Sequence, residues 1–335
     1  MSVRARRFSF PWPLLLACAC SSTVSIPEDA LPPLAALAQQ VDAERLMGHV
    51  RELAELRRTE TPLACTPEHE ERAPQRCHLT QSGVRGLLQR RFESLGLQVR
   101  LQSSEHLGLE VINVVAELPG TTHPEEIVLV GAHFDAFYQG ADDNASGVAA
   151  LLELARVFSA HRFERTVRFV GFDMEELGLA GSTHYVDVAG SERLEAALVF
   201  DSIGYYDSAP GSQRSIPGVP SPDTGDFVAV IGNDTSSQLA AELHALNTRL
   251  GLMKTATVLG PGQGASPLTG ELLRSDHTPF WLTGGKALFL TDTADFRNPH
   301  YHQDSDVPET LSPEPFRQTV RMSAVGLAWW AGGPR

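Results

Sequence analysis

From about residue 111 to the C-terminus, short apolar runs alternate with segments in which apolar residues recur at helical spacing. Parallel strands need long crossover connections, and helices supply them. The runs at 127–133 and 167–172 are almost continuously apolar, which is typical of strands buried on both faces of a sheet. The pattern therefore predicts an α/β fold, with a single domain and a mostly parallel central sheet covered by helices on both faces.

The expected elements follow this alternation. Strands are expected at 97–101, 111–118, 127–133, 167–172, 197–200, 227–231 and 287–291, and helices at 34–57, 80–95, 146–159, 179–188, 235–250 and 313–330. Thr80 or Ser82 is expected to cap the second helix, and Gly96 to end it. Stretches rich in Gly at 204–226 and 259–270 predict long surface loops. The N-terminal helices are expected to pack on the sheet, so the predicted domain spans 34–335.

Histidine and carboxylate side chains gather just after these strands. The clusters are His133, Asp135, Asp142 and Asp143; Asp173, Glu175 and Glu176; Asp201; Asp276 and His277; and His300 and His302 on either side of Tyr301. The carboxyl ends of parallel strands converge on one edge of a sheet, so we expect the clusters to be neighbours in space. Because unpaired buried charges repel one another, a divalent metal among them is the economical explanation.

The residue types indicate which chemistry such a site would support. Mixed His and carboxylate ligands suit Zn²⁺, Mn²⁺ or Co²⁺, and no thiolate is present to enforce zinc. Five ligands with one shared carboxylate could hold two ions about 3.5–4 Å apart, lowering the pKa of a bridging water. A hydrolase also needs a base that is not a ligand, and adjacent Glu175 and Glu176 offer one group for each task.

Each cluster taken alone also has a purely structural interpretation. Asp142, Asp143 or Ser146 could cap the helix at 146–159. Glu175 and Glu176 suit the first turn of a helix, where acidic residues are favoured. The metal site is favoured because five such clusters occur together in one α/β pattern.

Six segments together resemble the motifs of peptidase family M28, the family of two-zinc aminopeptidases. They are Gly131-Ala-His-Phe-Asp135, Gly140-Ala-Asp-Asp-Asn-Ala-Ser-Gly147, Phe172-Asp-Met-Glu-Glu-Leu-Gly178, Phe200-Asp-Ser-Ile-Gly204, Arg274-Ser-Asp-His-Thr-Pro-Phe280 and Tyr301-His302. They run in the family's order between about residues 111 and 325. The resemblance implies the fold of zinc-dependent exopeptidases.

The resemblance also implies a role for each matching residue. Two Zn²⁺ ions per chain are implied, with Mn²⁺ or Co²⁺ as alternatives. The implied ligands are His133 and Asp201 for one ion, Glu176 and His302 for the other, and Asp143 as the bridge. The implied catalytic residues are Glu175 as general base, Asp135 to orient His133, and Tyr301 as a donor to the tetrahedral intermediate, with Asp276 and His277 in supporting roles. His300 is an alternative to His302 as the metal ligand. His302 is preferred because it follows Tyr301 and precedes Asp306 at the family's spacing.

The expected function is that of a metal-dependent exopeptidase, foremost an aminopeptidase that hydrolyses N-terminal peptide bonds through a metal-bridged water. The alternatives are a carboxypeptidase or a glutaminyl-cyclase-like enzyme of the same fold, and a non-catalytic envelope protein that binds metal. A pure binding protein has no need of Glu175. Peptides are the expected substrates, and the formal net charge of −14 argues against a nucleic-acid partner. The sequence leaves the oligomeric state open.

Residues 1–20 are expected to be an export signal. Arg4, Arg6 and Arg7 precede an apolar stretch at 8–19 that is too short for a transmembrane span. Leu15-Leu16-Ala17-Cys18 resembles a lipobox, which makes Cys18 a candidate for lipidation; an ordinary cleaved signal is the alternative. We expect residues 21–33 to be a linker, and the protein to be exported to the cell envelope or the extracellular space.

Two further cysteines, Cys65 and Cys77, bracket a short loop. An exported protein is expected to oxidise such a pair to a disulfide. The alternative is a metal site completed by His69 or His78, although the spacing fits no common zinc motif.

Overall fold

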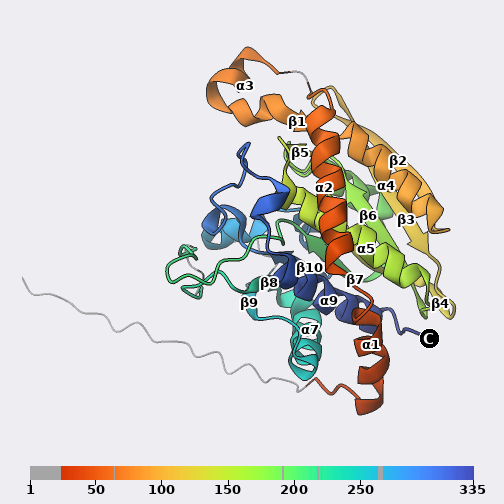
Figure 1. Cartoon of the computed structure of the whole chain (residues 1–335). Coiled ribbons are helices and arrows are strands. Elements are labelled where there is room, and N and C mark those ends of the chain that lie inside the picture. The colour runs from red at the N-terminus through yellow and green to blue at the C-terminus, as the bar shows by residue number, and fades with distance from the viewer. Residues whose placement is uncertain (1–23, 64, 191, 217–218, 220, 263–266) are drawn as a thin grey trace, which may run out of the picture.

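The computed structural model describes residues 24–63, 65–190, 192–216, 219, 221–262 and 267–335 (Figure 1). The strands in these ranges are β1 (Leu79–Thr80), β2 (Gln98–His106), β3 (Leu109–Leu118), β4 (His123–His133), β5 (Ala136–Phe137), β6 (Arg165–Phe172), β7 (Arg193–Phe200), β8 (Val228–Asn233), β9 (Thr255–Gly260) and β10 (Ala287–Thr291). The α-helices are α1 (Leu31–Ala38), α2 (Ala43–Thr59), α3 (Pro67–Arg72), α4 (Ser82–Ser94), α5 (Gly147–Ser159), α6 (Ala180–Ala189), α7 (Ser237–Leu250), α8 (Thr278–Leu282) and α9 (Pro313–Trp330).

The main sheet of the described chain has the strand order β2-β3-β6-β4-β7-β10-β8-β9. The four central strands β6, β4, β7 and β10 run parallel to one another. Antiparallel pairs lie toward the edges, between β2 and β3, β3 and β6, and β8 and β10. The prediction of a mostly parallel central sheet is confirmed, and the carboxyl ends of the central strands share one edge.

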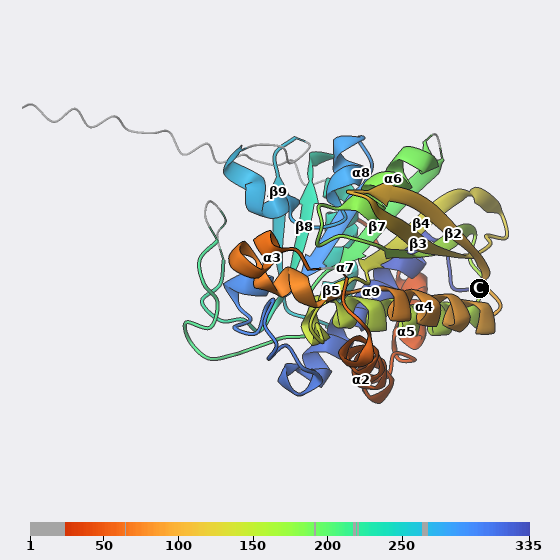
Figure 2. The same ribbon diagram turned by 90° about the horizontal axis from the view of Figure 1, so that it is seen from above.

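Helices cover both faces of the sheet (Figure 2). Side chains alternate along β4, as the pleat of a strand requires. Val128 and Val130 pack into a core with α1, α2, α4, α5, α7 and α9, whereas Leu129 packs into a second core with α6 and α8. The strand is therefore buried on both faces, as its continuous apolar run predicted.

The N-terminal part of the chain differs from the prediction in its element boundaries. The helix expected at 34–57 is two helices, α1 and α2, separated by a turn. Asp42 caps α2 by accepting a hydrogen bond from the backbone N–H of Arg45 at 2.8 Å. Helical structure already begins at Glu28, inside the segment expected as a linker.

Two predictions about loops and caps were also wrong in detail. An unpredicted edge strand, β9, includes the first two residues of the loop expected at 259–270. Neither Thr80 nor Ser82 caps α4; the carboxylate of Glu60 accepts hydrogen bonds from the N–H groups of Ser82 at 2.7 Å and Gly83 at 2.9 Å. The cap therefore comes from a residue beyond the end of α2. Gly96 ends α4 with a φ of 75°, as predicted.

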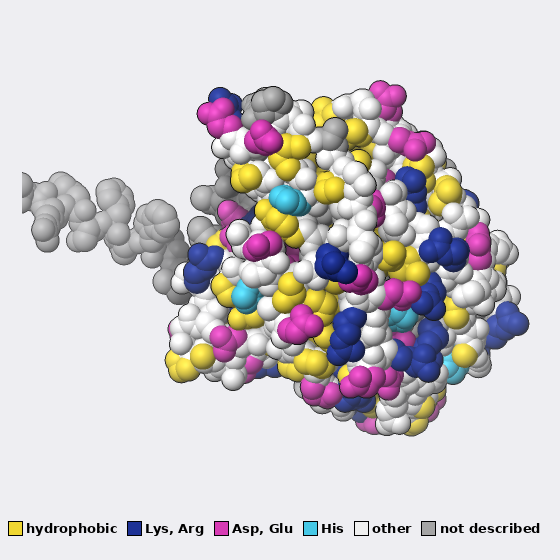
Figure 3. Space-filling model, turned by 45° about the horizontal axis from the view of Figure 1, so that its top comes forward, with side chains coloured by type: hydrophobic (Ala, Val, Ile, Leu, Met, Phe, Trp, Pro, Cys, Tyr) yellow, Lys and Arg dark blue, Asp and Glu magenta, His cyan; other side chains and the backbone are white. Residues whose placement is uncertain are grey.

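Cys65 and Cys77 are joined by a disulfide, so neither thiol is free to bind a metal. The bonded loop contains α3, at the top of Figure 1. The expected signal segment, including Cys18, lies outside the described residues. Within the described ranges, no helix has both the length and the apolar character needed to span a bilayer. Acidic and basic side chains are interspersed on the face shown in Figure 3.

Candidate metal centre

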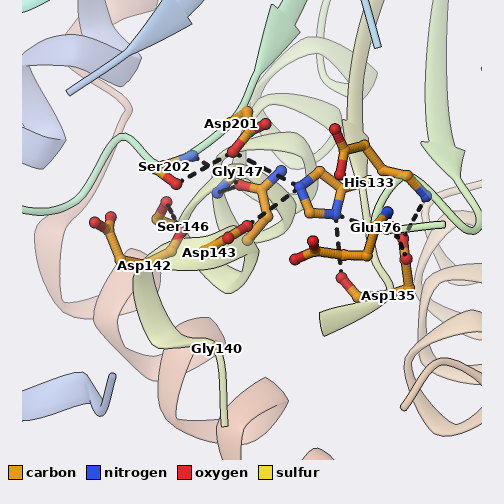
Figure 4. A network of polar contacts seen from close by, with 12 residues as sticks. His133, Asp135, Gly140, Asp142, Asp143, Ser146, Gly147, Glu176, Asp201 and Ser202 are labelled. Atoms are coloured by element: carbon orange, nitrogen blue, oxygen red, sulfur yellow. Dashed lines mark hydrogen bonds and ion pairs between the residues drawn. The ribbon is translucent and has the colours of Figure 1, made fainter. Parts of the chain in front are cut away.

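The predicted ligands meet at the carboxyl edge of the central strands. His133, Asp143, Glu176 and Asp201 are labelled in Figure 4. His133 is the last residue of β4, and Asp201 directly follows β7. Glu176 lies four residues beyond the end of β6, and His302 lies in the turn region after β10. The order of the strands in the sheet, β6-β4-β7-β10, therefore brings together residues from distant parts of the sequence.

Asp143 connects two groups of ligand atoms. Its Oδ1 lies 3.3 Å from His133 Nε2, which is 3.7 Å from Asp201 Oδ1. Its Oδ2 lies 2.9 Å from His302 Nε2, which is 3.2 Å from Glu176 Oε1. Within each group the ligand atoms all lie within 4.8 Å of one another. The structure thus divides the five predicted ligands into the two expected sets.

These residues fit a pair of divalent ions. The atoms His133 Nε2, Asp143 Oδ1, Glu176 Oε1 and His302 Nε2 are buried and have no hydrogen-bond partner. Leaving buried polar atoms unpaired destabilises a fold, and one cation in each ligand group would satisfy all four. Nitrogen and oxygen donors in this combination suit zinc.

Electrostatic coupling within the cluster is strong. Burial opposes protonation of His302, yet Glu176 and Asp143 outweigh it and raise its pKa to about 10. Burial likewise disfavours ionisation of Asp143, but His133 and His302 hold its pKa below the ordinary value. Burial raises the pKa of Glu175 well above its usual value, and the nearby Glu176 and Asp201 add to the increase. The site therefore favours positive charge at its centre.

Asp135 joins the ends of β4 and β6. Its two carboxylate oxygens accept hydrogen bonds from the N–H groups of Glu175 at 3.0 Å and Glu176 at 3.1 Å. Its Oδ1 also lies 3.5 Å from His133 Nδ1, which is 3.1 Å from the Asp135 carbonyl oxygen. Asp135 thus contacts the histidine that it was predicted to orient, and it also holds the backbone of both glutamates.

Asp142 is not in the ligand set. Its carboxylate accepts hydrogen bonds from Gly204 N at 2.8 Å and Asn298 Nδ2 at 2.7 Å. Asp306 accepts from the N–H groups of Asp142 at 2.9 Å and Asp143 at 3.1 Å, and so fixes the backbone of the ligand loop. Asp306 was not among the predicted site residues, although its position after His302 at the family's spacing was the signal available.

The remaining predicted residues are placed as follows. Tyr301 stacks on His302, with ring centroids 3.8 Å apart. His300 Nδ1 instead lies 2.9 Å from Ser305 Oγ, so His300 does not join the cluster.

His277 is buried and stacks on Phe289, with ring centroids 4.6 Å apart. Its Nε2 lies 2.7 Å from the carbonyl oxygen of Leu272. Burial lowers the pKa of His277 to about 4 and raises that of Asp276 to about 7. Both side chains interact electrostatically with Asp201, and their predicted supporting role stays a prediction.

A pocket opens next to the ligands. Asp201 and Tyr301 form its boundary with the metal centre. Its other described lining residues are largely apolar: Ile216, Ile231, Leu272, Phe289, Ala294 and Phe296, with Thr291, Thr293, Glu271 and Arg274. Such a pocket suits an apolar side chain held beside the reacting bond.

The model of peptidase family M28 matches residues 113–325. The uncharacterized protein YfbL of Escherichia coli (strain K12) is 34% identical over 251 residues, which cover 68% of this chain and 74% of that protein. Aminopeptidase YwaD of Bacillus subtilis (strain 168) is 46% identical over 206 residues, which cover 58% of this chain but 39% of YwaD. The crystal structure of LapB from Legionella pneumophila shares the fold, with a TM-score of 0.65 at 19% identity over 92% of this chain and 77% of LapB. The family match spans more than half of the sequence, and the chain therefore belongs to peptidase family M28.

Proposed function

We propose that this chain is a two-zinc aminopeptidase that acts on peptides after export. The observation that carries the proposal is the position of Asp143, which presents one carboxylate oxygen to each of two ligand groups. A single-ion site has no need of this division. Membership of the family and the zinc metalloproteases among the relatives support zinc as the metal.

The proposed ligands are His133 and Asp201 for one ion, Glu176 and His302 for the other, and Asp143 for both. Bound ions would polarise the scissile carbonyl and lower the pKa of a water. In this proposal Glu175 would accept a proton from the attacking water and pass it to the leaving amine, because it lies beside the ligand Glu176 and is not itself in either ligand group. Asp135 keeps Glu175 in place through its backbone N–H.

The surroundings of the centre favour cleavage at the amino end of a peptide. The apolar pocket beside Asp201 and Tyr301 would receive the first side chain. The carboxylates along the same edge would attract the free α-ammonium group. Tyr301, which stacks on His302 and borders the pocket, would donate a hydrogen bond to the carbonyl oxygen of the bond to be cut. The relative YwaD is named an aminopeptidase, which also supports cleavage at the amino end.

The proposed location is the cell envelope or the extracellular space. The apolar stretch after Arg4, Arg6 and Arg7 and the lipobox-like segment support export, with Cys18 as the lipidated residue. The Cys65–Cys77 disulfide agrees with an oxidising compartment.

The test is hydrolysis of aminoacyl-p-nitroanilides, with zinc counted on the same sample. We expect about two zinc ions per chain, activity on leucyl substrates, and none on the N-acetylated substrate. The variant Glu175→Gln should keep its zinc and lose about 10²–10⁴-fold in kcat.

Two results would overturn the proposal. A chain that binds two ions but cleaves only blocked or C-terminal substrates is another kind of exopeptidase. A chain that binds no zinc tightly does not have the proposed centre.

A further inference from the structure

The inward-facing stripe of α2 ends in a buried arginine. Leu46, Val50 and Leu53 follow one another at helical spacing on this face and are fully buried. Arg57 takes the next position of the stripe and is 2% exposed, although arginine is seldom buried without a partner. Its neighbour Arg58 points outward and pairs with Glu55. α2 lies beside α5, and residues 43–59 precede the segment matched by the family model (Figure 1).

The guanidinium of Arg57 holds both ends of the loop that connects two of the ligands. Nη2 donates to the carbonyl of Phe134 at 3.1 Å, directly after His133. Nη1 donates to the carbonyls of Gln139 at 3.2 Å and Gly140 at 2.7 Å, shortly before Asp143. Gly140, labelled in Figure 4, has a φ of 49°, which makes this bend a position for glycine.

Nearby carboxylates partly compensate the burial of this charge. Burial lowers the pKa of Arg57 to about 10, and the buried carboxylates of Asp143, Asp135 and Asp306 act against that decrease. Arg57 also lies in the last turn of α2, where the helix dipole stabilises a positive group. The cation therefore offsets part of the repulsion among carboxylates of the ligand loop.

We propose that Arg57 is a positioning residue for the metal centre: it fixes the 134–140 loop so that His133 and Asp143 face the same ion. The inference rests on the proposed two-metal function. A planar guanidinium can bond three carbonyls on two sides of a loop at once, whereas a lysine ammonium at the end of a flexible stem cannot reproduce that fork. The contact geometry, and not only the charge, is what the proposal requires.

The test compares Arg57→Lys with Arg58→Lys in the full-length protein. Zinc affinity is measured by competition with a chromophoric chelator, together with kcat, KM and urea unfolding of the metal-free form. We expect Arg57→Lys to weaken zinc binding about 10–100-fold, as is typical of residues that support metal ligands. We also expect kcat to fall while KM changes less than about twofold, since the substrate pocket is untouched. Arg58→Lys should match the wild type.

Leu53→Ala separates positioning from simple destabilisation. This variant loosens the same helix without touching the three carbonyls, and we expect lower stability with unchanged zinc affinity. If Leu53→Ala weakens zinc binding as much as Arg57→Lys, or if Arg57→Lys binds zinc like the wild type, the inference is wrong. If the wild type itself binds no zinc, the proposed two-metal function is wrong, and the inference about Arg57 is wrong with it.

Discussion

His300 and His302 are separated by one residue, yet their surroundings differ. His302 Nε2 points to the carboxylates of Asp143 and Glu176. Tyr301 stacks on the His302 ring, and Phe137 contacts that ring edge-on, with ring centroids 4.8 Å apart. His300 hydrogen-bonds with Ser305 instead. The φ of 58° at His302 turns the chain, so that the two rings do not share one direction. Of these two histidines, His302 belongs to a candidate ligand group and His300 does not.

This difference predicts how each histidine affects zinc content. His302→Ala should lower the content from roughly two ions per chain to roughly one, because Glu176 and Asp143 alone complete a poor site. Most of the turnover should disappear with the second ion. Metal analysis after gel filtration checks the stoichiometry.

His300→Ala is the matched control, and we expect it to keep both ions and at least half of the wild-type kcat. Loss of one ion from His300→Ala, with His302→Ala unaffected, would exchange the roles of the two residues.

Among the structural elements, the disulfide loop lies close to the metal centre. Its second cysteine leads through His78 into β1, which pairs with β5. Leu79 lies opposite Phe137 in this small sheet, and Phe137 packs against His302. His78 stacks on Tyr138 at 4.3 Å. The loop and the site are thus joined by contacts between two short strands.

The double variant Cys65→Ser/Cys77→Ser should therefore be less stable. Closing a loop of this size restricts the unfolded chain and contributes roughly 3 kcal/mol to the free energy of unfolding. Urea unfolding of both proteins with and without reductant measures the effect. Reductant should destabilise the wild type to the level of the variant and leave the variant unchanged; equal stability of the two oxidised proteins would contradict the prediction.

Elements with a strong apolar pattern were the ones that the sequence predicted best. β10 and α9 have the bounds expected from their apolar patterns, 287–291 and 313–330. The break between α1 and α2 was missed because apolar spacing continues across it, with Leu37 and Val41 both buried. The edge strand β9 was missed because its exposed positions weaken the apolar signal.

The contacts that support the site left no local pattern. Arg57 bonds with Gly140 across 83 positions, and Asp306 bonds with Asp143 across 163. Spacing rules describe neighbours along the chain, so they predicted that the polar clusters meet at the strand ends, and they gave no role to Arg57 or Asp306 behind them. An arginine on the apolar stripe of α2 was the one local sign of such a contact.

The whole molecule places many carboxylates on one edge of its sheet. The chain has 41 acidic and 27 basic residues, and part of the acidic excess is buried. Burial raises the pKa values of Asp142, Asp292 and Asp306, which shows that their ionised forms are disfavoured in the fold. Arg57 and Arg297 are the buried arginines that lie against this group in the described chain.

Metal removal should consequently lower the stability of the entire domain, because ligand carboxylates left without a cation repel one another. Bound zinc at a thousandfold excess over its Kd stabilises the native state by about 4 kcal/mol for each site. Thermal and urea unfolding before and after chelation, followed by zinc readdition, measure this contribution. Glu175→Gln should show the same loss on chelation and the same recovery, since Glu175 is not a ligand. An unfolding midpoint that chelation does not move would mean that the buried acids are compensated without metal.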